Sequence, residues 1–219
     1  LKQTPGQEKA LAYLNAFTDL TIPLRLGGHS KGGNFAIYAG MYCEKSLRDR
    51  IIAIYNNDGP GFSRDVVMST AYQNLLPVIT TIVPESSVVG RLFEHQEDYI
   101  VIKSENKGLK QHDAMSWEVL GNHFVHAVTP ANQSVLANQA IREWIALIPR
   151  DKRKEIVEAV FQILDAAGIE TVDDFLTLQL KDIRTIIQTK KKLPHETSDS
   201  ISDAAFLLIK IMIKTFTSS

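Results

Sequence analysis

A serine, an aspartate and a histidine follow one another along the chain in a setting suited to nucleophilic acyl transfer. Ser30 is the central residue of Gly28-His29-Ser30-Lys31-Gly32, which fits the G-x-S-x-G pattern of a nucleophile held on a strand-to-helix turn. A serine hydroxyl needs a neighbouring base to remove its proton, and that base needs an acid to orient it. In proteins with this turn the three residues come in the chain order serine, acid, histidine. We therefore predict Ser30 as the nucleophile and look for its partners further along the chain.

The glycines of this motif have a steric explanation. A nucleophile on a sharp turn adopts a strained backbone, and a side chain two residues before or after it would collide with the neighbouring strand or helix. We expect Gly28 and Gly32 to be required for this reason, with Gly33 allowing further close approach. The backbone N–H of Lys31, at the start of the next helix, is expected to point toward an oxyanion formed at Ser30.

The chain contains six histidines, and their positions favour one as the base. His112 lies in a polar, glycine-containing loop after the last predicted strand, where the base belongs in such proteins. His123 and His126 follow shortly after it and remain alternatives. The other three fit less well: His29 is expected to pack beneath the turn, His95 precedes the fourth predicted strand, and His195 lies in a linker.

Two carboxylates are the main candidates for the acid. Asp58 ends the second predicted strand in Asn57-Asp58-Gly59-Pro60, and its short side chain beside a glycine turn suits it to hold an imidazole. Glu85 ends the third strand, where many serine hydrolases place their acid. Glu94, Glu97 and Asp98 are further options, and a role of Asp58 as a simple turn former stays open.

Apolar runs predict the elements that position these residues. Strands are expected at residues 22–26, 51–55, 78–83 and 99–103, and helices at 4–16, directly after Ser30 and at 66–76. The run at 51–55 is continuously apolar, which is typical of a strand buried on both faces. Strand, helix and strand in close succession form a βαβ unit with parallel strands. We predict an α/β fold of the α/β-hydrolase type, a mostly parallel sheet flanked by helices.

From Pro130 onward the spacing of apolar residues becomes helical. Helices are predicted at 132–148, 151–167 and 200–216, with two shorter ones within 173–189. We therefore expect two domains, an α/β core at residues 1–149 and a helical appendage at residues 150–219. Lys190, Lys191 and Lys192, just before Leu193-Pro194, are expected in a solvated linker.

Composition limits the classes of partner and site. The formal net charge of −1 gives no general attraction to nucleic acid. No apolar run reaches the ~18 residues that a membrane-spanning helix needs. Cys43 is the only cysteine, so no internal disulfide is possible, which suits a reducing, cytoplasmic setting. No paired histidine or cysteine has the spacing of metal ligands, so neither a metal nor another cofactor is predicted.

Four segments carry a resemblance to known proteins: G-G-H-S-K-G-G-N, I-Y-N-N-D-G-P-G-F, I-V-P-E-S-S-V-V-G and K-G-L-K-Q-H-D-A-M-S-W. Together they resemble the bacterial, largely uncharacterised Mbeg1-like family and, more distantly, the class 3 lipases. The resemblance covers roughly residues 4–189. It implies an α/β-hydrolase fold with esterase or lipase-type activity, and it assigns Ser30 as nucleophile and His112 as base.

The sequence departs from these lipases at two places. Class 3 lipases carry the acid in a D-x-V segment that here reads Ser87-Val88-Val89, so the acid is absent from that position. Pancreatic-type lipases have it one strand earlier, in a D-P turn similar to the segment around Asp58, which favours Asp58. Lys31 stands where lipases commonly have an apolar residue, and its charge argues against a long-chain lipid substrate.

These observations predict a serine esterase that acts on a small-molecule or lipid ester; the oligomeric state is not predicted. A thioesterase or acyltransferase with the same triad, and a non-catalytic relative that serves as a binding or scaffold module, are the alternatives. Only 29 residues precede Ser30, although such folds place several strands and a second oxyanion donor before the nucleophile. We therefore expect those strands and that donor to lie upstream of Leu1.

Overall fold

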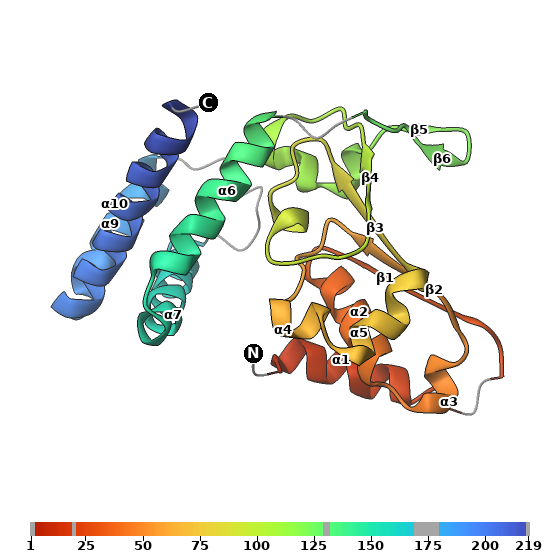
Figure 1. Ribbon diagram of the computed structural model, residues 1–219. Coiled ribbons are helices and arrows are strands. Elements are labelled where there is room, and N and C mark those ends of the chain that lie inside the picture. Colours follow the sequence, from red (N-terminus) through yellow and green to blue (C-terminus); the bar gives the residue numbers. More distant parts are fainter. Residues whose placement is uncertain (1–2, 19–20, 129–131, 169–179, 218–219) are drawn as a thin grey trace. The chain divides into compact units, whose positions relative to one another are not determined.

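The computed structural model describes residues 3–18, 21–128, 132–168 and 180–217 (Figure 1). The chain forms two compact units, Leu1–Asn138 and Gln139–Ser219. The division falls inside helix α6 (Asn132–Leu147), whereas the sequence analysis places the domain boundary between residues 149 and 150.

The first unit is built on a parallel sheet of four strands in the order β1-β2-β3-β4 (Figure 1). The strands are β1 (Leu24–His29), β2 (Ile51–Asn57), β3 (Ile79–Pro84) and β4 (Tyr99–Ile102). Helices α1 (Pro5–Asn15) and α2 (Lys31–Tyr42) pack against each other, and α2 also packs on β1 and β2. The α/β class and the parallel sheet flanked by helices are thus confirmed.

Shorter elements connect the strands of the first unit. They are α3 (Lys45–Arg48), α4 (Arg64–Val67), α5 (Thr70–Leu75), the 3₁₀ turns η1 (Leu76–Val78), η2 (Val89–Arg91), η3 (Gly108–His112) and η4 (Ala114–Ser116), and the hairpin of β5 (Val119–Leu120) and β6 (His123–Phe124). The single helix predicted at 66–76 is therefore wrong. Ser69 interrupts it because its hydroxyl accepts a hydrogen bond from the Tyr72 N–H and starts a new helix there.

Helix α1 begins as the sequence predicts. The Thr4 hydroxyl accepts a hydrogen bond from the Gln7 N–H at 3.2 Å, and the Gln7 side chain accepts one from the Thr4 N–H at 3.0 Å. Pro5 occupies the first helical position, where no intrahelical N–H bond is lost. This capping box fixes the start of the helix that packs beside α2.

The strand register places two candidate residues next to each other. His29 is level with Asn57, and Asn57 is level with Ile82, so β1 and β2 end at the same edge of the sheet. The Ser30 N–H then donates to the Asn57 carbonyl at 2.9 Å, and the Asp58 N–H donates to the Ile82 carbonyl at 2.8 Å. The carboxyl ends of parallel strands thus bring Ser30 and Asp58 to one edge.

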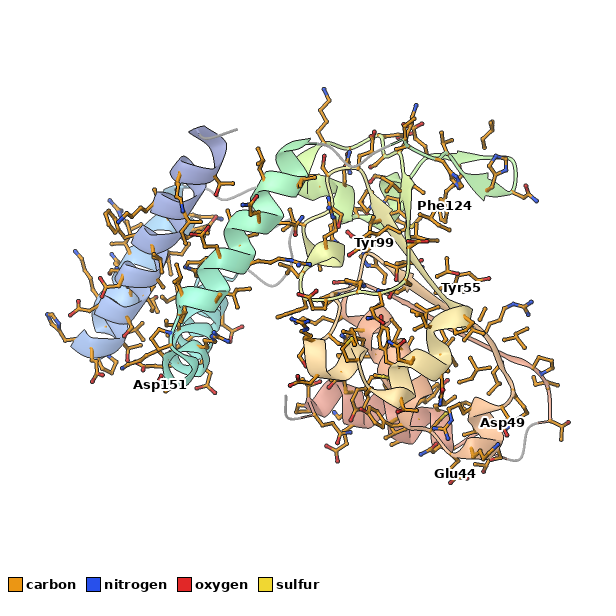
Figure 2. All side chains as sticks on the ribbon, viewed as in Figure 1. Glu44, Asp49, Tyr55, Tyr99, Phe124 and Asp151 are labelled. Atoms are coloured by element: carbon orange, nitrogen blue, oxygen red, sulfur yellow. The ribbon has the colours of Figure 1, made fainter. Side chains whose placement is uncertain are left out.

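Strand β2 is not buried on both of its faces. Ile54 is fully buried and lies beside Gly40 of α2. Its neighbour Tyr55 is exposed (Figure 2). Successive side chains of a strand point to opposite faces. The prediction of two buried faces is therefore wrong for this strand, because α2 covers only the side on which Ile54 lies.

The second unit is helical and contains α7 (Arg150–Ala166), α9 (Leu180–Lys192) and α10 (His195–Thr217). Helix α7 packs against both α9 and α10, and Ile148, Ile156 and Ala204 form a buried cluster with Trp144 beside it. Two expectations fall on residues outside the described ranges: the helical onset at Pro130 and the start of the pair at 173–189. No helix of the described residues is long and apolar enough to cross a membrane.

The linker predicted at the three lysines before Leu193 is wrong, because these lysines belong to helix α9. Lys190, Lys191 and Lys192 form the last turn of the helix, and Lys190 Nζ donates to the Ser202 hydroxyl at 2.6 Å. Cations are favourable at a helix C-terminus because the helix dipole is negative there. The helix therefore continues to Lys192 and ends just before Pro194.

In the first unit, hydrogen bonds to the buried Glu97 carboxylate join α5, β3 and the segment just before β4. Glu97 accepts hydrogen bonds from Tyr72 and Thr81, each at 2.5 Å, and from His95 Nδ1 at 2.9 Å. Burial raises the pKa of Glu97, but the hydrogen bonds from His95, Thr81 and Tyr72 outweigh burial and lower that pKa to about 2. The ionised carboxylate therefore stabilises the fold.

The substitution Glu97→Gln tests this network. Because the folded-state pKa lies below the unfolded one, the stabilisation is fully present above about pH 5 and is lost as the pH falls toward 2. We expect Glu97→Gln to lower the free energy of unfolding by about 2–3 kcal/mol at pH 7 and by much less near pH 3. Urea unfolding at both pH values measures this, with the exposed Glu105→Gln as control; an equal loss at both values contradicts the account.

Candidate active site

Ser30 occupies a strained turn between β1 and α2. Its φ of 55° and ψ of −129° lie in a region that residues with a side chain rarely adopt. The strain is held by neighbouring backbone, because the Ser30 N–H donates to Asn57 and the Ser30 carbonyl accepts from the Gly33 N–H at 3.0 Å. This turn presents the hydroxyl at the carboxyl edge of the sheet.

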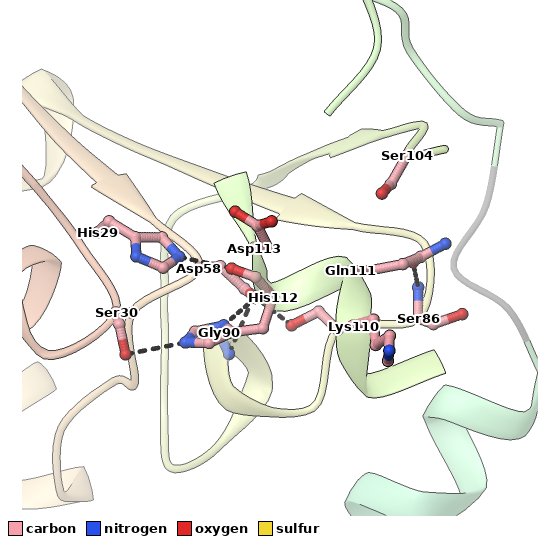
Figure 3. A network of polar contacts seen from close by, with 12 residues as sticks. His29, Ser30, Asp58, Ser86, Gly90, Ser104, Lys110, Gln111, His112 and Asp113 are labelled. Carbon is pink, nitrogen blue, oxygen red and sulfur yellow. Dashed lines mark hydrogen bonds and ion pairs between the residues drawn. The ribbon is translucent and has the colours of Figure 1, made fainter. Parts of the chain in front are cut away.

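His112 lies between Ser30 and Asp58 (Figure 3). Its Nε2 is 3.0 Å from Ser30 Oγ, and its Nδ1 is 2.7 Å from Asp58 Oδ2. An ionised carboxylate only accepts hydrogen bonds, so Nδ1 carries the proton and Nε2 is left to accept from the Ser30 hydroxyl. The structure thus brings together three residues that lie far apart in the sequence, in the serine–histidine–acid arrangement that the sequence predicts.

Asp58 is held in one orientation by contacts to both carboxylate oxygens. The residue is fully buried and has a φ of 52°. Oδ2 accepts from His112, while Oδ1 accepts from the Ser87 hydroxyl and from the Gly90 N–H at 3.1 Å. Asn56 stabilises the turn, because its Oδ1 accepts from the Gly59 N–H at 3.0 Å. A buried carboxylate with this many donors is fixed in position.

The loop that carries His112 is anchored on both sides. His29 Nε2 donates to the His112 carbonyl at 2.7 Å, and the two imidazole rings lie 4.7 Å apart. Trp117 Nε1 donates to the Gln111 carbonyl at 2.8 Å, and the Gln111 side chain accepts from the Ser86 N–H at 2.7 Å. His29 is exposed and lies beside the base, so the expectation that it packs beneath the turn is wrong.

The other candidate acids and bases lie elsewhere. Glu85 follows β3 and its N–H donates to the Ile102 carbonyl; no described interaction joins its side chain to His112. His95 and Glu97 belong to the buried network described above. Exposed positions hold the remaining candidates, namely Glu94, Asp98, His123, His126 and His195.

No group of three or more histidine, cysteine, aspartate or glutamate side chains in the described residues is arranged to hold a metal ion. The side chains that meet at this edge of the sheet are a hydroxyl, an imidazole and a carboxylate. In enzymes, such a set can transfer acyl groups through a covalent serine intermediate.

Of the three glycines around Ser30, two make the close contacts that the sequence predicts and one does not. A Cβ added at Gly28 would overlap the backbone of Gly32, and one added at Gly33 would overlap the Asn56 side chain. A Cβ at Gly32 would meet no described atom within 4 Å. The steric role predicted for Gly32 is therefore wrong, because the space that its side chain would enter is open. The close contacts predicted for Gly28 and Gly33 are confirmed.

Alanine substitutions separate these positions. Gly28→Ala and Gly33→Ala are each expected to cost about 2 kcal/mol or more of unfolding free energy, because backbone or the Asn56 side chain must move. Gly32→Ala is expected to be neutral or to stabilise α2 by up to about 1 kcal/mol, since alanine favours helix. Thermal unfolding of the three variants measures the difference, and a loss at Gly32 as large as that at Gly28 would contradict it.

Several residues of the site carry no recognisable signal in the sequence. Ser87 lies in the loop after β3, yet its hydroxyl donates to Asp58, which follows β2. Gln111 and Trp117 border His112 in the sequence, but nothing in their types marks them as anchors of its loop. Only the three-dimensional contacts identify these positions.

Comparison with models of protein families shows the family of this chain. The family model described as Mbeg1-like matches residues 1–162, which is most of the chain and includes every residue of the Ser30–His112–Asp58 arrangement. No curated protein and no solved structure is significantly similar to the chain. On the extent of this match, the chain belongs to the Mbeg1-like family.

Proposed function

We propose that the protein is a serine esterase with an α/β-hydrolase fold, in which Ser30, His112 and Asp58 form the catalytic triad. The observation that carries the proposal is the position of the His112 imidazole, within hydrogen-bond distance of both Ser30 Oγ and Asp58 Oδ2. The strained backbone of Ser30 at a strand-to-helix turn supports it further.

The geometry supports a two-step reaction. In the first step His112 Nε2 takes the hydroxyl proton as Ser30 Oγ attacks the ester carbonyl, and the imidazolium then gives that proton to the departing alcohol. In the second step His112 deprotonates a water molecule that attacks the acyl-serine, and the proton returns to Ser30 as the carboxylic acid leaves. Asp58 stabilises the imidazolium in both steps because its carboxylate stays beside Nδ1.

The start of α2 supplies a donor for the oxyanion. The first N–H groups of a helix have no intrahelical acceptor, and the Ser30 side chain does not cap them. The N–H of Lys31 follows the nucleophile directly, and the positive end of the helix dipole favours negative charge there. We propose Lys31 N–H as an oxyanion donor.

A fluorophosphonate probe tests the activated serine directly, because it phosphonylates a serine only when a base assists. We expect the whole chain to gain one adduct by intact-protein mass spectrometry. The adduct should be absent in Ser30→Ala and should form about 10³-fold more slowly in His112→Ala. The exposed Ser46→Ala serves as matched control and should label normally. A wild-type chain without an adduct would contradict the esterase proposal and favour a non-catalytic binding module.

Ser87 is proposed as a positioning residue that acts through Asp58. Removing its hydroxyl leaves Asp58 Oδ1 with one donor fewer in a buried site, so the carboxylate is less firmly oriented toward His112. We expect Ser87→Ala to lower kcat on a p-nitrophenyl ester about tenfold with KM unchanged. Ser86→Ala is the matched control, since only the backbone of Ser86 contacts the His112 loop. Equal activity of both variants would remove Ser87 from this role.

A further inference from the structure

A groove of about 500 Å³ opens beside the first turn of α2 in the first unit. Its lining includes Phe35, Tyr38 and Tyr42, which belong to α2, together with Phe62 and Phe93. The volume lies in the range of sites that bind small molecules, and five of the lining residues are aromatic. The groove is therefore suited to an elongated apolar group.

Two of the polar side chains in the walls, Gln7 and Asn34, already have hydrogen-bond partners within the protein. Gln7 Nε2 donates to Asn34 Oδ1 at 2.9 Å, and Asn34 Nδ2 donates to the carbonyls of Pro60 and Gly61, each at 3.0 Å. Groups that are paired with each other offer little to a ligand. Gln7 and Asn34 therefore offer little to a ligand, whereas the buried Ser63 Oγ has no hydrogen-bond partner among the described residues.

Charge is concentrated at one end. Among the described residues that line the groove, Lys31 alone carries a charge, and it is the residue directly after Ser30. The N-terminus of α2 adds a positive partial charge at the same end. From Lys31 to Tyr42 the helix rises by about 16 Å. The groove therefore combines a cationic end with a long apolar wall.

We propose that this groove binds an amphiphilic anion, with a carboxylate or phosphate at Lys31 and an aliphatic chain along α2 toward Tyr42. An ammonium head group would be repelled by the positive end of the groove. An uncharged aliphatic molecule would gain no electrostatic attraction from Lys31. A fatty carboxylate is what hydrolysis of an acyl ester at Ser30 releases, so this proposal reverses the expectation that the Lys31 charge argues against a long-chain lipid substrate. The origin of the ligand thus rests on the proposed function, whereas the binding itself does not.

Titration calorimetry of the whole chain tests the proposal with three probes below their critical micelle concentrations: dodecanoate, dodecyl phosphate and dodecyltrimethylammonium. We expect one or both anions to bind and the cation to bind at least fivefold more weakly. Lys31→Met, which keeps the length of the side chain but removes its charge, should weaken anion binding about fivefold. Lys9→Met, at an exposed position on α1, is the matched control and should change nothing.

Further measurements locate the aliphatic chain of the ligand and identify its head group. Tyr38→Ala should weaken binding of dodecanoate and leave that of acetate unchanged, because only the longer molecule reaches this wall. Tighter binding of dodecyl phosphate would support the proposal with a phosphate head, and tighter binding of dodecanoate would support it with a carboxylate. Equal binding of anion and cation, unaltered affinity in Lys31→Met, or no binding of either anion would overturn it. None of these results depends on turnover, so they are independent of fluorophosphonate labelling.

Discussion

The Asp58 carboxylate sets the main constraint on the first unit. It is fully buried, and burial of a charge is costly unless each oxygen is hydrogen-bonded. His112 provides one of those bonds from the loop after β4, and Ser87 and Gly90 provide the others from the loop after β3. The loops after β3 and β4 must therefore fold against the end of β2, and removal of any partner leaves a buried charge under-satisfied.

The register between strands β1 and β2 makes this arrangement possible. Because β1 and β2 are parallel and end level with each other, the residues that follow them lie side by side without any special loop. Both of these residues, Ser30 and Asp58, have positive φ although neither is glycine. Strained backbone of this kind persists only where the surroundings hold it, and here the adjoining strands do so through Asn57 and Ile82. Stability and the proposed chemistry thus depend on the same contacts.

Structural features that depend on a few adjacent residues could be predicted from the sequence. The capping box at Thr4, the four strands and the turn around Ser30 are features of this kind. Asp58 and His112 could be predicted as acid and base from the chain order and from their places after parallel strands. The contacts of Ser87, His29 and Trp117 were not predictable, because they join segments far apart in the sequence. Gly32 was misjudged for a related reason: whether a glycine is needed depends on what lies across from it.

The most direct test of the central claim is the tautomer of His112, read from two-bond ¹H–¹⁵N correlations of histidine-labelled protein at a pH where the imidazole is neutral. Assignment uses the His112→Gln variant. A carboxylate at Nδ1 and a hydroxyl at Nε2 predict the proton on Nδ1, and Asp58→Asn should abolish that preference. A His112 with its proton on Nε2, or one indifferent to Asp58→Asn, would contradict the account.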